Sequence, residues 1–165
     1  MALGKDYARQ DCSMARALEV IGERWTMLII RDALYGVRRF SDFLAHLDIP
    51  RAVLSARLQS LVESGVLEKS GHEYVITEMG EELWPVVHAL ARWGERYFDD
   101  CGPTRLYVHA GCAVRLAPDG TCPECGRAVP PEEVELRPGP GGHRRTDPVS
   151  LALREPHRLL RPIQT

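Results

Sequence analysis

Residues 40–76 read FSDFLAHLDIPRAVLSARLQSLVESGVLEKSGHEYVI, and this stretch decides the fold. Apolar residues recur with helical spacing in two runs, 40–47 and 54–61, which are separated by a break that contains Pro50. Proline suits the first turn of a new helix, because the N–H that it lacks would have no partner within the helix there. The pattern therefore predicts two short helices joined by a tight turn, the second over about 50–64.

The residues around these two helices mark their ends and the element that follows. Ser41 is a suitable N-cap for the first helix, and Gly65 ends the second. Beyond Gly65 the apolar period changes, which predicts short strands at 66–69 and 72–76 across a Ser70-Gly71 turn. Two helices followed directly by a hairpin are the parts of a winged helix-turn-helix.

Further helices are expected on both sides of this unit. Ser13 caps a first helix over about 14–22, and an almost wholly apolar helix follows over about 25–34. Thr77 caps a long helix over about 78–99, which Pro85 should kink or restart. Short strands are expected at 106–109, 113–116 and 134–136, and one helix near 150–154. The fold class is therefore mainly α with a small β-wing (α+β): a winged helix-turn-helix domain plus a small β-rich C-terminal lobe.

The composition is that of an ordinary folded protein. The 165 residues are 44% hydrophobic and 27% charged, and 21 basic against 23 acidic residues leave a net charge of −2. No apolar run approaches the roughly 18–20 residues that a membrane span needs, and the N-terminus has no apolar signal core, so we expect a cytoplasmic protein with no membrane partner. The expected divisions are an N-terminal arm (1–12), the winged domain (13–100), a small lobe rich in cysteine and histidine (101–137) and a Pro/Gly/Arg-rich tail (138–165).

The second helix of the pair has the features of a recognition helix for the DNA major groove. Leu54, Leu58 and Leu61 define its buried side. Small and hydrogen-bonding residues point the other way, and such residues let a helix approach base edges closely. Arg57 lies on a flank, where it suits a phosphate or structural contact. The candidate DNA contacts are Arg38, Arg39, Ser41, Arg51, Ala52, Ser55, Ala56, Arg57, Gln59, Lys69 and His72.

Several segments, in the same order along the chain, resemble one family of regulators. They are 12–26 (CSMARALEVIGERWT), 38–41 (RRFS), 54–58 (LSARL), 63–67 (ESGVL), 74–80 (YVITEMG) and Trp93-Gly94. From about residue 10 to 98 the chain is thereby similar to the HxlR-type transcriptional regulators, relatives of the MarR group. The resemblance implies a dimeric DNA-binding regulator. The wing of that family is often longer and contains proline, whereas the turn here is short, with Lys69 and His72 as its basic candidates at the tip.

The long helix is expected to pair with a second copy of the chain. Its apolar stripe includes Trp84, Trp93, Tyr97 and Phe98, which is more apolar surface than a small winged domain needs. Helices that flank a winged domain commonly pair with the same helix of a partner and bury such surface symmetrically. The alternative is that the helix packs on its own domain. The residues assigned to dimerisation are Met14, Leu18, Trp84, Val87, Leu90, Trp93 and Tyr97.

Cys12 is a candidate redox sensor. It lies one residue before a predicted helix N-terminus, where the helix dipole and free N–H groups favour a thiolate, and Arg9 and Arg16 are near in the sequence. Some regulators similar to this one sense oxidants or electrophiles through a cysteine at this place. The alternative is a small buried residue that packs the arm against the dimer.

The C-terminal third carries a candidate metal site. His109 and Cys112 form an H-x2-C pair, and Cys122 and Cys125 follow as a C-x2-C pair. Two such turns on adjacent hairpins can place four ligands tetrahedrally around zinc. The CPECG piece resembles a zinc-ribbon knuckle, although the first pair has His109 where that pattern has a cysteine. The alternatives are reduced thiols without metal and a disulfide or redox pair.

These patterns predict transcription regulation rather than catalysis. The sequence has no P-loop, dinucleotide-binding, metalloprotease or nucleophile-elbow motif, so we expect no enzymatic activity. A dimer would bind a two-fold symmetric operator in double-stranded DNA, with a small molecule or an electrophile as an unidentified effector. The alternative is a winged-helix interaction module that does not read DNA and docks on another protein through its C-terminal lobe.

Overall fold

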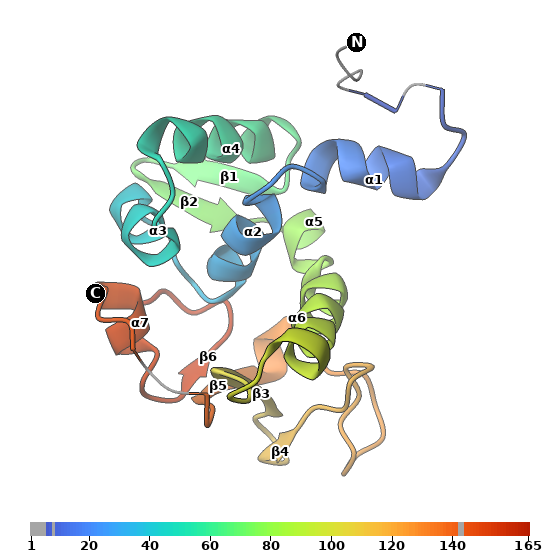
Figure 1. The fold of residues 1–165 in the computed structure, drawn as a ribbon, viewed down its shortest axis with the longest axis vertical. Coiled ribbons are helices and arrows are strands. Elements are labelled where there is room, and N and C mark those ends of the chain that lie inside the picture. Colours follow the sequence, from blue (N-terminus) through green and yellow to red (C-terminus); the bar gives the residue numbers. More distant parts are fainter. Residues whose placement is uncertain (1–5, 8, 142–143) are drawn as a thin grey trace.

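The computed structural model describes residues 6–7, 9–141 and 144–165, and its helices and wing lie above a small antiparallel sheet (Figure 1). The helices of the upper part are α1 (Ser13–Ile21), α2 (Thr26–Leu34), α3 (Phe40–Leu47), α4 (Arg51–Glu63), α5 (Glu78–Glu81) and α6 (Trp84–Phe98). The wing is the hairpin of β1 (Leu67–Ser70) and β2 (Glu73–Ile76). The expected α+β winged helix-turn-helix class is confirmed. Among the described residues, no helix has the length and apolar character that crossing a membrane requires.

The helix starts differ from the sequence expectation by about one residue. α3 begins at Phe40 with Arg39 in the N-cap position, so Ser41 lies inside the helix and is not its cap. The wing is the reason, because Arg39 pairs with Glu73 in an isolated bridge that keeps the chain extended up to the first helical residue. α1 likewise has Cys12, not Ser13, in its N-cap position.

α4 and the wing keep the predicted arrangement with one change at the turn. Leu54, Leu58 and Leu61 of α4 are buried, as their helical spacing predicts. The hairpin pairs Ser70 with Glu73, so its turn is Gly71-His72 rather than the expected Ser70-Gly71. Gly71 adopts a φ of 60°, a left-handed conformation that glycine accepts without steric cost.

The long helix expected over 78–99 is two helices. The Thr77 hydroxyl accepts a hydrogen bond from the Gly80 N–H at 3.2 Å and caps α5. α6 then begins at Trp84, and Pro85 occupies its first turn, where a missing N–H costs no helical hydrogen bond. The restart that Pro85 predicts is therefore observed, and α6 runs down to the C-terminal sheet (Figure 1).

The C-terminal part is built around a four-stranded antiparallel sheet with the order β4-β3-β5-β6. Its elements are β3 (Arg105–His109), β4 (Val114–Arg115), the 3-10 helix η1 (Pro131–Glu133), β5 (Val134–Pro138), α7 (Pro148–Ala152) and β6 (His157–Arg158). The segment expected to be a tail (138–165) contains the helix expected near 150–154, as α7, and in addition the strand β6, which joins the sheet. The end of this segment returns to the winged domain, where the N–H groups of Leu160 and Ile163 donate to the carbonyls of Leu34 and Gly36 at 2.8 and 3.0 Å.

One continuous core joins the winged part to the C-terminal sheet. The buried hydroxyls of Tyr35 and Tyr107 share a hydrogen bond of 2.7 Å. The Trp84 ring lies edge-on to Tyr107 with 5.1 Å between centroids, and its Nε1–H donates to the Val129 carbonyl at 3.1 Å. Trp84 and Val87 were expected at a dimer surface, but both are buried within their own chain, because the C-terminal part covers this stretch of α6.

The buried tyrosine pair gives a first test of this architecture. Tyr35→Phe and Tyr107→Phe should each lower the free energy of unfolding by about 1–3 kcal/mol, because each leaves one buried hydroxyl without its partner. The double variant should cost less than the sum of the two single losses. Urea unfolding followed by circular dichroism measures the three values. Strictly additive losses would show that the two hydroxyls do not depend on each other.

Candidate nucleic-acid interface and candidate metal centre

The outer face of α4 is polar, carries small side chains and is open to solvent. Ala52, Ser55, Ala56 and Gln59 are all exposed, on the side of the helix away from the buried leucines. The Gln59 amide donates to Glu63 at 2.8 Å, one helical turn farther along. A helix with this outer face can approach base edges in a major groove.

Two exposed arginines and one serine lie where α3 and α4 begin. The Arg51 guanidinium stacks over the Phe40 ring, 5.1 Å from its centroid. Such stacking restrains a guanidinium while its N–H donors stay available for a base or a phosphate. Arg39 and Ser41 are exposed at the start of α3. The beginnings of both helices thus present hydrogen-bond donors to solvent.

Two other arginines predicted to contact DNA have acidic partners on the chain. Arg38 lies 3.8 Å from Glu73, and Arg57 lies 3.7 Å from Glu23. Ion pairs at a protein surface contribute only about 0–1 kcal/mol, so a phosphate group can displace these carboxylates. Both side chains suit contacts with the DNA backbone better than base recognition.

The wing is short and has two basic side chains near its tip. The Lys69 Nζ lies 5.6 Å from the centroid of the Tyr74 ring, which is a cation–π contact. His72 is exposed in the two-residue turn. Because the turn has only two residues, the wing reaches beyond its two strands by little more than the length of these side chains.

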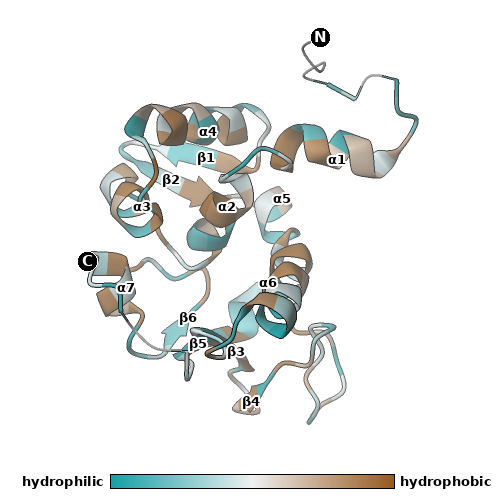
Figure 2. Cartoon of the chain, in the orientation of Figure 1, coloured by the Kyte–Doolittle hydropathy of each residue, from teal (hydrophilic) through white to brown (hydrophobic). Residues whose placement is uncertain are grey.

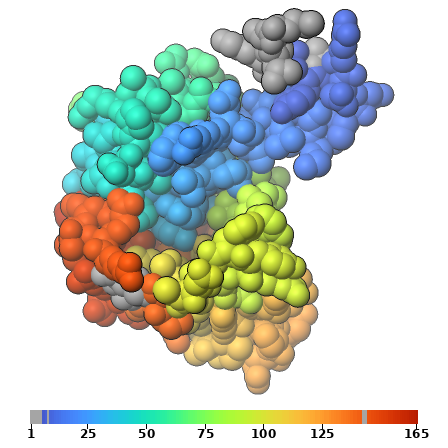
Figure 3. All heavy atoms as spheres, viewed as in Figure 1, coloured from blue at the N-terminus to red at the C-terminus, as the bar shows by residue number. Residues whose placement is uncertain are grey.

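Two helices present apolar side chains that the chain itself leaves uncovered. On α6, Leu90, Trp93 and Tyr97 share one face and are 50–59% exposed. On α1, Met14 is 68% exposed and Leu18 is half-buried. Figure 3 shows α1 standing out from the body of the molecule, and Figure 2 shows apolar bands along α1 and α6. Five of the seven residues assigned to dimerisation therefore lie outside the buried core of the chain.

Cys12 is a free, exposed cysteine in the N-cap position of α1. The Arg16 guanidinium, near it in the sequence, forms an ion pair with Glu19 at 2.9 Å. The redox role of Cys12 stays a prediction.

The four predicted metal ligands lie together at one end of the C-terminal sheet. The ligand atoms of His109, Cys112, Cys122 and Cys125 are all within 4.8 Å of one another. The His109 Nδ1 and Cys125 Sγ atoms are 3.7 Å apart. Zinc bonds of about 2.0–2.3 Å place tetrahedral ligand atoms roughly 3.5–3.8 Å apart, so the cluster fits one ion after small side-chain movements.

Two tight turns bring these ligands together. β3 ends at His109, and the Ala113 N–H donates back to the His109 carbonyl at 2.8 Å. In the second turn, the Gly126 N–H donates to the Cys122 carbonyl, also at 2.8 Å. Gly126 has a φ of 72°, which favours glycine at the position that closes the turn.

Glu133 is a contributor to this cluster that the sequence analysis missed. Its carboxylate and the His109 Nε2 atom are hydrogen-bonded at 3.1 Å, and Arg127 pairs with the same carboxylate. This bond assigns the ring proton to Nε2 and leaves Nδ1 for a metal, as carboxylates commonly do behind histidine ligands. The register of β3 and β5 would have indicated Glu133, because His109 pairs with Val134, the residue after Glu133.

The thiols of the cluster differ in acidity. A hydrogen bond from the Cys125 backbone N–H lowers the pKa of the Cys122 thiol to about 6. Burial raises the pKa of the Cys112 thiol to about 11, and its hydrogen bonds to the other two thiols add to this shift. A cation would favour the deprotonated form of all three, since thiolates are the form that binds metals.

Comparisons with known proteins point to one family. Residues 20–101 match the family model described as HxlR-like helix-turn-helix. Rv3095, an uncharacterized HTH-type transcriptional regulator of Mycobacterium tuberculosis, is 40% identical over 137 residues, which are 78% of this chain and 87% of that protein. YdeP, another such regulator from Bacillus subtilis, is 31% identical over 108 residues, or 59% of this chain and 84% of that protein.

The solved structure of PA1607, described as a candidate transcription factor, has the same fold. It is 38% identical, covers 70% of this chain and 96% of its own, and superposes with a TM-score of 0.56. The match to the mycobacterial protein spans more residues than the winged part contains, so the similarity extends into the C-terminal sheet.

Proposed function

The chain belongs to the HxlR-like helix-turn-helix family of transcriptional regulators, and we propose that it reads a two-fold symmetric DNA site as a homodimer. The observation that carries this proposal is the exposed outer face of α4, with Arg51 at its start. Placed in the major groove, this face would bring Ala52, Ser55, Ala56 and Gln59 against base edges. The naming of its relatives as HTH-type regulators supports DNA as the partner.

The arginines take different roles in this proposal. Arg51 recognises a guanine, because its guanidinium is restrained at the N-terminal end of the recognition helix. Arg39 contacts a phosphate, and Arg38 and Arg57 exchange their carboxylate partners for phosphates. Lys69 of the wing contacts the neighbouring backbone.

Two substitutions separate base recognition from backbone contact. Arg51→Ala should weaken operator binding by about 1–3 kcal/mol and relax the preference at one base position. Arg39→Ala should weaken binding to all sequences alike and lower the salt slope by about one unit. Fluorescence anisotropy over a salt series measures both effects, using DNA selected from a random pool. The selected sites should contain inverted half-sites with centres about 10 bp or a multiple of that apart.

Arg137→Ala is the matched control, because Arg137 lies on β5 of the C-terminal sheet and pairs with Glu135. It should bind DNA like the wild-type protein. Unchanged affinity in both Arg51→Ala and Arg39→Ala would show that the groove-facing surface lies elsewhere. A pool from which no sequence is enriched would favour the protein-interaction alternative.

We also propose that α1 and the exposed face of α6 form the dimer interface. α1 has nine residues and buries only Ala15 within its own chain. Isolated helices of this length are marginal in water, so α1 requires another surface to stabilise it. The matching apolar face of α6, on Leu90, Trp93 and Tyr97, would be buried in the same interface. A symmetric pair of this kind would set the spacing of the two recognition helices.

A charge placed on this surface should separate the protomers. Leu90→Glu should convert the dimer to a monomer, because pairing would bury an unpaired carboxylate. Leu151→Glu is the control, since Leu151 is exposed to a similar extent on α7, outside the proposed interface. Size-exclusion chromatography with light scattering measures the mass, and circular dichroism checks folding. A monomeric wild-type protein, or a dimer that persists in folded Leu90→Glu, would contradict the proposed interface.

We further propose that His109, Cys112, Cys122 and Cys125 hold one zinc ion. Three thiolates and an imidazole form a donor set that suits zinc and excludes magnesium or calcium. Four protein ligands close the coordination sphere, so the ion would contribute folding energy rather than catalysis. The bond from His109 to Glu133 supports this role, because it turns Nδ1 toward the thiols.

Removing one exposed ligand tests the metal site with little effect on packing. Protein purified without chelator should contain close to one zinc per chain. Cys125→Ser should lose the zinc and lower the unfolding midpoint by more than about 10 °C, because structural zinc contributes several kcal/mol. Cys101→Ser is the control, since Cys101 is also exposed but lies outside the cluster. Elemental analysis that finds no zinc in folded wild-type protein would contradict the assignment.

A further inference from the structure

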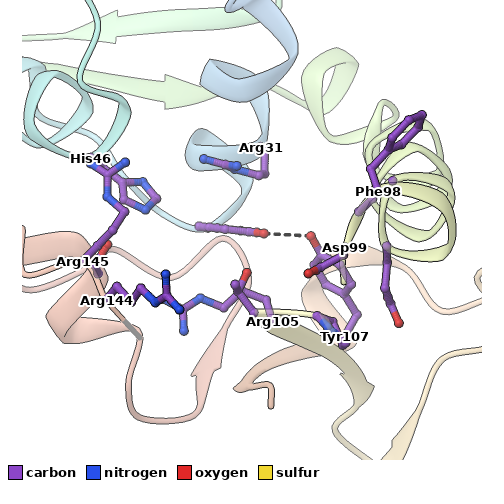
Figure 4. A pocket seen from close by; sticks show the side chains of 15 residues that line it. Arg31, His46, Phe98, Asp99, Arg105, Tyr107, Arg144 and Arg145 are labelled. Carbon is purple, nitrogen blue, oxygen red and sulfur yellow. Dashed lines mark hydrogen bonds between the residues drawn. The ribbon is translucent and has the colours of Figure 1, made fainter. Parts of the chain in front are cut away.

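A cavity of about 540 Å³ lies between the winged part and the C-terminal segment, apart from the DNA-reading face and the metal cluster. Residues of α2, α3, α6 and β3 line it together with the chain just before α7. Figure 4 shows their side chains converging on one space from these separate elements. The volume is in the range of cavities that hold small organic molecules.

Four arginines line this cavity, and two of them lack an acidic partner. Arg31 and Arg145 form ion pairs with carboxylates at 2.7 and 3.1 Å. Arg105 and Arg144 line the same space, and neither forms an ion pair within the part of the chain that the structure describes. The lining therefore carries an excess of positive charge, because four arginines face the two carboxylates of Glu95 and Asp99.

Arg105 is the more enclosed of these two arginines. Its guanidinium donates one N–H to the Leu153 carbonyl at 2.8 Å, which fixes the side chain and leaves most of its donors unused. Burial lowers the pKa of Arg105, and the nearby positive charge of Arg31 lowers it further. Tyr35, Tyr107 and Asp147 oppose this lowering, and a bound anion would oppose it further, because it would add negative charge and hydrogen-bond acceptors beside the guanidinium.

The remaining lining offers apolar surface. The hydroxyls of Tyr35 and Tyr107 are bonded to each other, so these residues present mainly their rings. Gly94 of α6 also lines the cavity, and a side chain at this position would meet no atom within 4 Å. Its lack of a side chain keeps this wall open. Phe98 borders the α6 end of the space, but its ring turns outward (Figure 4), where it is 72% exposed and packs on Trp93 with 5.0 Å between centroids.

The acidic residues of the lining make the two ends of the cavity electrostatically different. Glu95 is already bonded to Arg92 and Arg115, at 2.7 and 2.6 Å. Asp99 is exposed at the same α6 end, next to Phe98 (Figure 4). Because like charges repel, an anionic group would avoid this end and settle beside Arg105 and Arg144.

We propose that this cavity binds a small organic carboxylate with an aromatic ring. The carboxylate pairs with Arg105 and Arg144, whose planar guanidinium groups match its geometry. The ring lies toward Tyr35, Tyr107 and the wall that Gly94 keeps open, where it fills space that an inorganic ion would leave empty.

The position of the cavity makes such a ligand an effector, a consequence that rests on the proposed DNA-binding function. Gly94 of α6 lines the cavity, while Trp93 and Tyr97 belong to the proposed dimer interface on the neighbouring face of the same helix. On the other side, Arg145 donates to the Ala45 carbonyl of α3 at 3.1 Å. A ligand would therefore bridge the dimer helix and the helix-turn-helix, and change the distance between the recognition helices.

The test uses the full chain without DNA, so its result does not depend on the proposed function. The probes are benzoate, phenylacetate and 3-phenylpropionate, each paired with its uncharged amide. Shifts in amide NMR spectra report binding and its location. We expect dissociation constants on the order of 1 mM for the acids, as befits fragments of this size, and at least about tenfold weaker binding of the amides.

Substitutions then locate the anion. Arg144→Gln should weaken binding of the acids about tenfold and leave the fold intact, because Arg144 is exposed. Arg105→Gln should act in the same direction. Arg137→Gln, on β5 outside the cavity, should bind like the wild-type protein.

Several outcomes would overturn the proposal. They are no binding of any acid up to about 20 mM, equal binding of acids and amides, or an unchanged affinity in folded Arg144→Gln. Inorganic phosphate that binds as tightly as the acids would also overturn it, because the ring would then contribute nothing. The effector role is tested separately, by operator affinity with and without phenylacetate. A changed affinity supports that role, and an unchanged one removes it while the binding site stands.

Discussion

The hydrogen bond between Tyr35 and Tyr107 is the contact on which the rest of the structure depends. Both hydroxyls are buried, and burial raises the pKa of both phenols, so each needs a neutral partner inside the core. Tyr35 directly follows α2, the central helix of the winged part, whereas Tyr107 lies in β3 of the C-terminal sheet. The bond therefore lies at the centre of the junction between the two halves, where the aromatic contacts of Trp84 and the backbone bonds of Leu160 and Ile163 also hold them together.

This junction connects surfaces that would otherwise be independent. The end of the chain returns to α2, and α6 packs its inner face on the C-terminal part while its outer face stays open. The arginine-lined cavity lies within the same junction, between α3 and α6. The C-terminal part is therefore joined to the winged part by packed elements rather than by a linker.

Local patterns in the sequence were sufficient to predict the helices and strands of the winged part, but not to predict which other parts of the chain cover them. The spacing of Leu54, Leu58 and Leu61 predicted which side of α4 is buried, and Pro85 predicted where a helix restarts. The same kind of pattern placed Trp84 at a dimer surface, because an apolar stripe does not reveal whether a partner or the chain itself covers it. The start of α3 differs from the prediction because Arg39 bridges Glu73, which is far away in the sequence, and this tertiary contact outweighs the local preference for Ser41 as the N-cap.

The two candidate sites show the same limit. The His/Cys cluster was predicted because the spacing in each of its turns is short and regular, and Glu133 was missed because only the strand register brings it to His109. The cavity has no sequence signature, since Arg31, Arg105 and Arg144 come from segments that are more than thirty residues apart. Apart from the helix expected near 150–154, residues 138–165 were predicted to be a tail, because glycine, proline and arginine conceal the few apolar residues, such as Val149 and Leu159, that enter the core.

Native-state amide hydrogen exchange tests most directly whether the winged part and the C-terminal sheet are one cooperative unit. We expect the slowest amides of α2 and β3 to open with the same free energy, and Tyr107→Phe to lower both values equally. Fast exchange in β3 beside slow exchange in α2, with Tyr107→Phe affecting β3 alone, would contradict the dependence of the two halves on each other.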